Sequence, residues 1–224
     1  MNSRILAVDT TSESGGLALL SGPEVVGQAG IQSPEGFGHL LFGEIERLLA
    51  RHGWRLDAID CFAAAAGPGS FTGIRVGLAA VKGLGEALGR PVVAVSNLQA
   101  VAWYGSAPLR AALIDARRGE IYAALYSASL QLVLPETVAS LRSWLRTLPD
   151  GPVELLSTNA SLIASALKGT PFQQLPLRQV PPALAVAVGT IAAKRLADGM
   201  ALAPAAVDAN YVRRSDAELF WKDS

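Results

Sequence analysis

The sequence predicts an α/β protein built from two tandem βββαβα units. Segments 4–9 and 109–115 are both apolar runs that end at an aspartate, and each is followed by a turn and a second apolar run. They lie in ILAVDTTSESGGLALL and AALIDARRGEIYAALY, which share a layout more than identities. Because a repeated layout indicates a duplicated structural unit, we expect two similar lobes, each a sheet flanked by helices.

The elements of the first unit follow from the spacing of its apolar residues. Short apolar runs bounded by turn residues indicate strands, and apolar residues three and four apart indicate helices. Gly53 is expected to end the first helix, Ser70 or Thr72 to cap the second, and Ser96 to cap the third. The expected strands are 4–9, 16–21, 24–32, 58–66 and 91–95, and the expected helices are 39–53, 72–88 and 97–105.

The second unit is expected to repeat this order. Its expected strands are 109–115, 120–127, 131–134 and 153–157, and its expected helices are 136–148, 159–169 and 183–199. This places an N-terminal lobe at 1–105 and a C-terminal lobe at 106–224. The last segment, about 183–224, is a candidate for packing back on the N-terminal lobe.

Composition and charge limit the class of function. The chain has 224 residues, of which 50% are hydrophobic, and 19 basic residues balance 19 acidic ones. A protein that binds nucleic acid by itself usually carries a basic surplus, and this sequence has none. The arginine pairs at 117–118 and 213–214 are the local basic concentrations, and such pairs are usually a solvated edge.

Cysteine use and the longest apolar stretch indicate where the protein works. Cys61 is the single cysteine, so no intrachain disulfide can form, as is usual in a reducing compartment. Segment 180–194 is too short and too rich in proline to cross a bilayer, which takes about 20 apolar residues. We expect a cytoplasmic protein with no membrane partner.

A glycine-rich turn, GPGSFTGIRVG at 67–77, joins an expected buried strand to a helix. It does not match the P-loop pattern, because Gly73 is followed by Ile74, nor the G-x-G-x-x-G pattern of dinucleotide sites, because its last spacing is one residue too long. Two interpretations stay open: a tight strand-to-helix connection, or an anion site at the helix N-terminus.

Small residues recur along the helix that follows this turn, at Gly73, Gly77, Ala80 and Gly83. Glycine costs about 1 kcal/mol in a helix interior relative to alanine, so the repetition indicates that another backbone approaches closely. That backbone belongs either to this chain's own sheet or to a second subunit.

The candidate chemical groups are few. Asp9 and Asp115 end the first strand of each unit. Together with Thr10 they are candidates for a nucleotide or Mg²⁺ cleft between the lobes. The alternative is that each aspartate is a turn residue that bonds its own backbone. The two histidines, His39 and His52, are not spaced to bind metal from one helical face, and no nucleophile–base pair is evident. We therefore assign no catalytic and no metal-binding residue.

Four stretches in order resemble the TsaB (YeaZ) family: ILAVDTTSESGGLALL, GPGSFTGIRVGLAAVKGL, ALIDARRGEIYAALY and DANYVRRSDAE. The resemblance runs from Ile5 to about Glu218. It implies an actin-like, sugar-kinase and Hsp70-like (ribonuclease H-like) fold, which agrees with the duplicated units. It also implies a non-catalytic subunit, distinct from the catalytic paralogue TsaD, which carries a two-histidine metal motif.

By this resemblance the protein acts in the complex that transfers threonylcarbamoyl from its adenylate to the adenosine beside the anticodon of tRNA. TsaD would be its heterodimer partner, bound by the N-terminal lobe at 1–105, and TsaE, an ATPase, would join them. Because the chain has no basic surplus, any tRNA contact of its own is expected to be secondary. The chain would bind itself when TsaD is missing and meet tRNA indirectly. No cofactor of its own is implied, and ATP and Mg²⁺ would enter at the level of the complex.

The resemblance further implies that the helices near 39–52 and 72–88 form a bundle with the partner. The interface residues expected from this are His39, Phe42, Glu46, Gly73, Arg75, Gly77, Leu78 and Ala80. Two alternatives remain. A stand-alone ATPase or kinase would use the cleft between Asp9 and Asp115, and a metallopeptidase would need a pair of metal-binding histidines.

Overall fold

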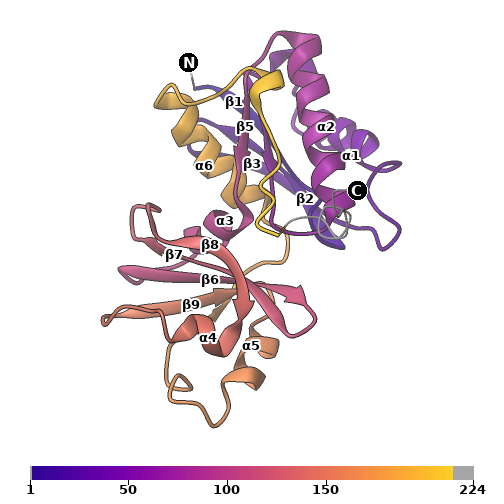
Figure 1. The fold of residues 1–224 in the computed structure, drawn as a ribbon. Helices are drawn as coiled ribbons and strands as arrows, with labels where there is room; N and C mark the ends of the chain where they lie inside the picture. The colour runs from indigo at the N-terminus through magenta and orange to yellow at the C-terminus, as the bar shows by residue number, and fades with distance from the viewer. Residues whose placement is uncertain (1, 214–224) are drawn as a thin grey trace, which may run out of the picture. The chain divides into compact units, whose positions relative to one another are not determined.

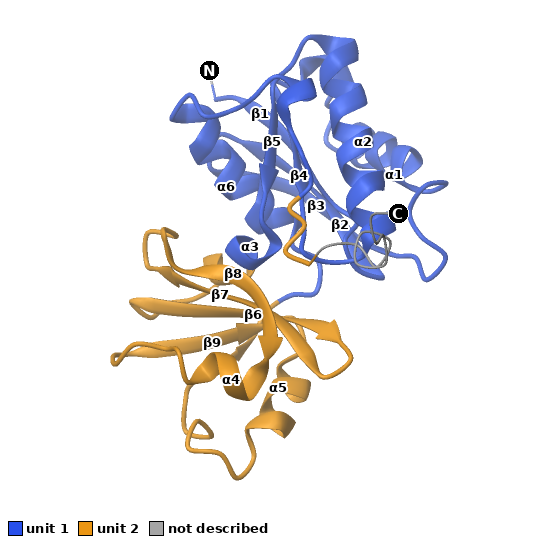
Figure 2. Cartoon of the chain, in the orientation of Figure 1, with its two compact units in different colours: residues 1–100, 181–209 blue, residues 101–180, 210–224 orange. Residues whose placement is uncertain are grey.

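The computed structural model describes residues 2–213, which form two compact units. The first unit comprises residues 1–100 and 181–209, and the second comprises 101–180 and 210–224 (Figure 2). Each unit contains one five-stranded sheet. The end of the tail motif, at 214–218, and Arg214 lie outside the described residues.

The sheet of the first unit has the strand order β3-β2-β1-β4-β5. β1 pairs antiparallel with β2 and parallel with β4, and β3 extends the antiparallel side, which confirms the expected meander. β1, β2 and β4 are buried along most of their length, which explains their continuous apolar sequences. The strands are β1 (Arg4–Asp9), β2 (Ser14–Ser21), β3 (Glu24–Gln32), β4 (Cys61–Ala65) and β5 (Val92–Val95).

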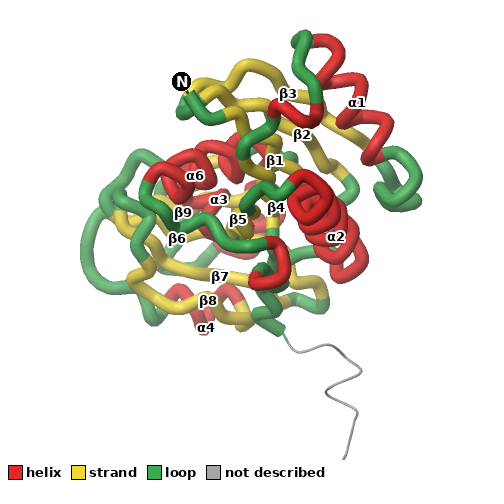
Figure 3. Tube along the Cα trace, turned by 90° about the horizontal axis from the view of Figure 1, so that it is seen from above, coloured by secondary structure: helices red, strands yellow, loops and turns green. Residues whose placement is uncertain are grey.

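Helices cover both faces of this first sheet. α1 (Leu41–Arg51) and α2 (Phe71–Leu88) lie on one face, and α6 (Ala185–Ala197) lies on the other (Figures 1 and 3). Ser70 caps α2 as predicted, because its hydroxyl accepts a hydrogen bond from a backbone N–H of the first turn. Gly89, at φ +62°, ends the helix in the left-handed conformation that glycine adopts readily.

The segment that carries α6 joins the first unit although it follows the second unit in sequence. α6 packs on β1 and β2, and a side chain at its Gly189 would overlap Leu20, so glycine allows the close approach. Beyond α6, Leu202 exchanges two backbone hydrogen bonds with Val92 of the edge strand β5, at 2.8 and 3.0 Å. The 3₁₀ turn η2 (Pro204–Ala206) follows.

The second unit repeats the strand plan of the first. Its sheet has the order β10-β9-β6-β7-β8, with β6 antiparallel to β7 and parallel to β9. Thus β6 takes the place that β1 has in the first sheet, and the predicted duplication is confirmed. The elements are β6 (Leu109–Arg117), β7 (Glu120–Ser127), β8 (Leu132–Ser140), α4 (Leu141–Leu145), β9 (Val153–Ser157), α5 (Ala160–Leu167) and β10 (Leu177–Gln179).

One predicted helix is wrong. The segment 136–148 was expected to be helical, but Glu136–Ser140 completes strand β8, and only the short α4 follows. The pairs Tyr122↔Val138 and Ala123↔Thr137 show the reason, since β7 offers an edge to which these β-branched residues pair. The apolar residues at 138 and 141 are three apart, which is the spacing of a helix. The strand β10 was not expected either, because three residues are too few to show a periodic pattern.

Smaller differences concern element ends. α1 begins at Leu41 instead of residue 39, and β4 begins at Cys61, after a 3₁₀ turn η1 (Leu56–Ala58) that the sequence pattern does not reveal. α3 (Asn97–Trp103) begins next to Ser96, whose hydroxyl accepts backbone hydrogen bonds from the first turn as predicted. In the described part of the chain, every helix is too short or too polar to cross a membrane.

Candidate partner-binding face and the corner beneath it

The carboxylate of Asp9, at the end of β1, is held inside the first unit. The side chain is 1% exposed. One oxygen accepts hydrogen bonds from the Thr11 backbone N–H at 3.0 Å and the Thr11 hydroxyl at 2.6 Å, and the other accepts from the Leu184 N–H at 2.7 Å, just before α6. Burial raises the pKa of Asp9 above 3.8, against these hydrogen bonds. Asp9 therefore joins β1 to the start of α6, and it makes the backbone bond expected of a turn residue.

Thr10 explains the glycines of α2. The Thr10 side chain is buried, and its hydroxyl donates a hydrogen bond to the Gly73 carbonyl at 2.7 Å. A Cβ on Gly73 would overlap the Thr10 carbonyl oxygen, and a Cβ on Gly77 would lie 2.5 Å from the Thr10 hydroxyl. The close approach that these glycines indicate is thus to this chain's own β1, which decides between the two alternatives left by the sequence.

The glycine corner, residues 67–70, fits around the same end of β1. The Ser70 N–H donates to the Thr11 carbonyl at 2.8 Å, and a Cβ on Gly69 would lie 2.7 Å from that oxygen. Asn97 closes the corner by accepting from the Gly67 N–H at 3.1 Å and donating to the Thr11 hydroxyl at 2.6 Å. These backbone groups bind protein atoms, so the structure favours the tight connection over the anion site.

Four of the expected interface residues point inward. Leu78 and Ala80 are each 6% exposed, and Gly73 and Gly77 are buried as well. The expectation that this small-residue stripe faces a partner is therefore corrected. The physical reason is that α2 carries small residues on two faces. The face with Gly73, Gly77 and Ala80 packs on the sheet, where Thr10 approaches the helix closely, and the face with Ala79 and Gly83 is exposed.

The exposed residues of α1 and α2 form the outward surface of these two helices, which we call the α1–α2 outer face. Phe42 is 57% exposed and Phe71 is 42% exposed, and the Arg75 guanidinium lies 3.7 Å from the Phe71 ring centroid. The face comprises Phe42, Glu46, Phe71, Thr72, Arg75, Ala79 and Gly83, all exposed, and His39 is exposed just before α1.

Gly83 is the α2 glycine that leaves room outside. It is exposed, and a Cβ added there would meet nothing within 4 Å. Ala79, four residues earlier, is also small and exposed, so another helix can pack closely against this part of α2. The sequence pattern grouped Gly83 with Gly73, Gly77 and Ala80, but in the structure Gly83 and Ala79 are exposed whereas the other three are buried.

Asp115 makes the turn bond that Asp9 makes. Its carboxylate accepts from the backbone N–H two residues later, Arg117, at 2.8 Å, as the carboxylate of Asp9 does with Thr11. The side chain of Asp115 is exposed, whereas that of Asp9 is buried. The duplication therefore extends to the hydrogen bonding of the two turns, and each aspartate is a turn residue in its own unit.

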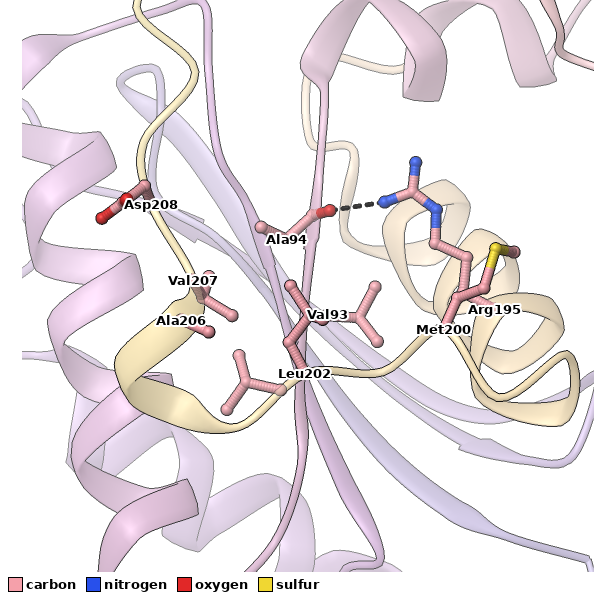
Figure 4. Close-up of a pocket in the computed structure, with 9 residues that line it drawn as sticks. Val93, Ala94, Arg195, Met200, Leu202, Ala206, Val207 and Asp208 are labelled. Carbon is pink, nitrogen blue, oxygen red and sulfur yellow. Dashed lines mark hydrogen bonds between the residues drawn. The ribbon is translucent and has the colours of Figure 1, made fainter.

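A small pocket lies at the outer edge of β5 (Figure 4). Its volume is about 190 Å³, below the roughly 300 Å³ at which small-molecule sites begin. The Arg195 guanidinium beside it donates to the Ala94 carbonyl at 2.6 Å and to the Gln99 side chain at 2.7 Å, so Arg195 anchors α6 to the edge strand. The apolar lining includes Val92, Val93, Met200, Leu202 and Val207.

Potential ligands for metal are scattered. Within residues 2–213, no three histidine, cysteine, aspartate or glutamate side chains come together in a group that could hold a metal ion. The thiol of Cys61 is fully buried in β4, and burial raises its pKa to about 12. It stays protonated near neutral pH and packs as a small apolar side chain.

Comparison with known proteins identifies the family. A family model described as "TsaD: tRNA N6-adenosine threonylcarbamoyltransferase" matches residues 38–174. The "tRNA threonylcarbamoyladenosine biosynthesis protein TsaB" of Bacillus subtilis (strain 168) is 30% identical, over 98% of this chain and 98% of that protein. The chain belongs to the TsaB (YeaZ) family.

Solved structures agree with this. YeaZ from Pseudomonas aeruginosa superposes with a TM-score of 0.78 at 28% identity, over 93% of the TsaB-family chain and 99% of YeaZ. Component A of the (R)-2-hydroxyglutaryl-CoA dehydratase of Acidaminococcus fermentans, at a TM-score of 0.55 and 10% identity over 87% of this chain and 99% of that one, shows the fold alone. The actin-like, sugar-kinase and Hsp70-like fold implied by the four sequence motifs is confirmed.

Proposed function

We propose that this TsaB-family chain is a non-catalytic subunit of the bacterial complex that forms threonylcarbamoyladenosine on tRNA. It acts there with TsaD and TsaE in the transfer of threonylcarbamoyl from its adenylate to the adenosine beside the anticodon. Family membership supports the pathway. The observation that carries the role of a docking subunit is the α1–α2 outer face, with its exposed phenylalanines.

The outer face has the composition of an interface core. Burying a phenylalanine side chain is worth about 1.5–3 kcal/mol, so leaving Phe42 and Phe71 exposed forgoes a gain that a partner can supply. Arg75 stacks on Phe71, and aromatic and arginine side chains dominate binding energy at protein interfaces. Gly83 and Ala79 permit close helix contact. We assign TsaD as the occupant, because residues 38–174, which include both helices, match the TsaD family model.

Two candidate reactive groups of the first unit, Asp9 and Cys61, are buried and serve the fold. Asp9 holds α6 and the β1 turn, and the Cys61 thiol is buried with a pKa raised to about 12. A subunit of this kind contributes a surface, while ATP and Mg²⁺ enter at the level of the complex with TsaE. When TsaD is absent, the same apolar face is available to a second copy of this chain.

The test is a binding and activity measurement on the double variant Phe42→Ala/Phe71→Ala. We expect its affinity for TsaD to fall at least tenfold and tRNA modification to fall in parallel, with an unchanged melting temperature. The matched control is Leu132→Ala/Val133→Ala, which removes two exposed apolar side chains from β8 of the second unit, 53% and 43% exposed. It should bind TsaD normally.

Two results would overturn the proposal. One is a full rate of modification by TsaD and TsaE without this chain. The other is unchanged TsaD binding by the outer-face variant. If the isolated chain turned over ATP, and Asp9→Ala abolished the turnover without unfolding, the stand-alone ATPase would be favoured instead.

A further inference from the structure

The outer edge of β3 is a long row of backbone groups at the margin of the first sheet. The strand order places β3 last on its side, with β2 as its neighbour. The strand has nine residues, and from Gly27 to Gln32 it pairs with β2 regularly, since its one register shift lies before Gly27. No other strand of residues 2–213 pairs with its outer side. Such an edge is a template to which a strand of another chain can be added.

The hydrogen bonding to β2 shows which backbone groups of β3 point outward. The Ser33 N–H donates to the Glu13 carbonyl at 3.0 Å, one step beyond the last pair of the two strands. In an antiparallel pair, positions that bond the neighbouring strand alternate with positions whose N–H and C=O point away from it. Counting back from Ser33, the outward positions are Gln28, Gly30 and Gln32, and all three are exposed.

The other sheet edges in the described part of the chain are protected against pairing. The edge strand β5 is covered where Leu202 exchanges two backbone hydrogen bonds with Val92. The edge strand β8 contains Pro135, and β10 is only three residues long. Covering segments, prolines and short strands are the usual means by which proteins keep edges from pairing. Residues 25–32 of β3 contain neither a proline nor a charged side chain, so this edge alone among them is left ready to pair.

We infer that β3 pairs with β3 of a second copy of this chain, antiparallel and centred on Gly30. With Gly30 opposite itself, Gln28 of each copy lies opposite Gln32 of the other, so every outward N–H faces a carbonyl. The glutamine amides carry both donors and acceptors, so two identical strands complement each other. Gln32 also bonds the Ser14 hydroxyl, at 2.8 and 3.1 Å, and its amide has a second N–H and a second lone pair for its neighbour. The neutral strands bring no like charges together.

This pairing goes beyond the proposed function, which assigns the α1–α2 outer face to TsaD and, in its absence, to a second copy. The β3 edge uses backbone groups of a strand and none of the residues that define the outer face. The variant Phe42→Ala/Phe71→Ala is therefore expected to keep the β3 pairing, and it serves as the background in which self-association through the outer face is weakened.

The test is a charge exchange at Gly30, where an added Cβ would meet nothing within 4 Å, so the substitutions leave the fold intact. In this background, sedimentation measures the dissociation constant of the dimer for Gly30→Lys, for Gly30→Glu and for their equal mixture. Each variant alone places like charges directly opposite each other and should dimerise at least tenfold more weakly. The mixture places opposite charges there and should regain the dimer. The matched control is Gly30→Thr, which is neutral, suits a strand and should dimerise as the unchanged strand does.

Three results would overturn the inference: a chain with unchanged β3 that stays monomeric at every concentration, a Gly30→Lys variant that dimerises as well as Gly30→Thr, or a mixture that regains nothing. Hydrogen exchange gives a second readout. The amide protons of Gln28, Gly30 and Gln32 should become protected in the dimer, while that of Ile31, which faces β2, should not change. TsaD binding by Gly30→Lys is expected to be normal, so a failure here is separable from a failure of the proposed function.

Discussion

Thr10 and Gly73 are joined at the point where β1 meets α2. The Thr10 hydroxyl donates to the Gly73 carbonyl at 2.7 Å, and the Thr10 carbonyl occupies the space that a Cβ on Gly73 would need. The end of the first strand therefore sets the start of α2, and with it the position of the outer face that we assign to TsaD.

Gly73→Ala tests this relationship. We expect it to lower the free energy of unfolding by about 1–3 kcal/mol, because the methyl group overlaps backbone that cannot move freely. Gly83→Ala on the same helix is the control and should raise stability by about 1 kcal/mol, since its Cβ would meet nothing and alanine favours helix. Urea unfolding measures both. Equal effects of the two substitutions would contradict the proposed packing.

Asp9→Asn is expected to lower stability at pH 7 by about 1–3 kcal/mol, because an amide nitrogen would face the Leu184 N–H. The raised pKa of Asp9 means that the folded protein binds a proton that the unfolded chain has released. The wild type therefore gains stability as pH falls through the raised pKa toward 3.8, and the asparagine variant does not. Urea unfolding between pH 7 and 4 should show the gap widening, and a gap that narrows would refute the assignment.

Glu154 of β9 should behave in the opposite sense. It is 6% exposed, and although burial opposes its charge, hydrogen bonds from the Ser106 N–H at 2.7 Å, the Arg178 guanidinium at 2.6 Å and the Ala107 N–H at 3.2 Å lower its pKa below 4.5. Such a group stabilises the fold above 4.5, and that stability is lost as pH falls through the lowered pKa.

The corresponding prediction is that Glu154→Gln lowers stability by about 1–3 kcal/mol at pH 7, where the charged hydrogen bonds are lost. The difference from wild type should shrink as pH falls below 4.5. Unfolding followed by a probe in the second unit gives the measurement. A difference that does not change with pH would show that the carboxylate carries no charge-dependent bonds.

Sequence patterns located most elements correctly, and the failures have local causes. Segment 136–140 has helical spacing, but pairing with β7 makes it a strand, since β propensity depends on the neighbouring edge. The α2 glycines were recognised as sites of close approach, and the burial of Gly77 against Thr10 shows that the approach is internal. A stripe of small residues looks the same in the sequence whether it packs on the chain's own sheet or on a second subunit.

The sequence by itself determined the duplicated α/β plan, the corner before α2, the capping serines and the family. These follow from periodicity, turn chemistry and local hydrogen bonding, which act between residues close in the chain. Tertiary structure alone decided which face of α2 looks outward and that Asp9 is buried against the start of α6. Those outcomes depend on contacts between residues 60 or more positions apart, such as Thr10 with Gly73 and Asp9 with Leu184, and no local pattern encodes them.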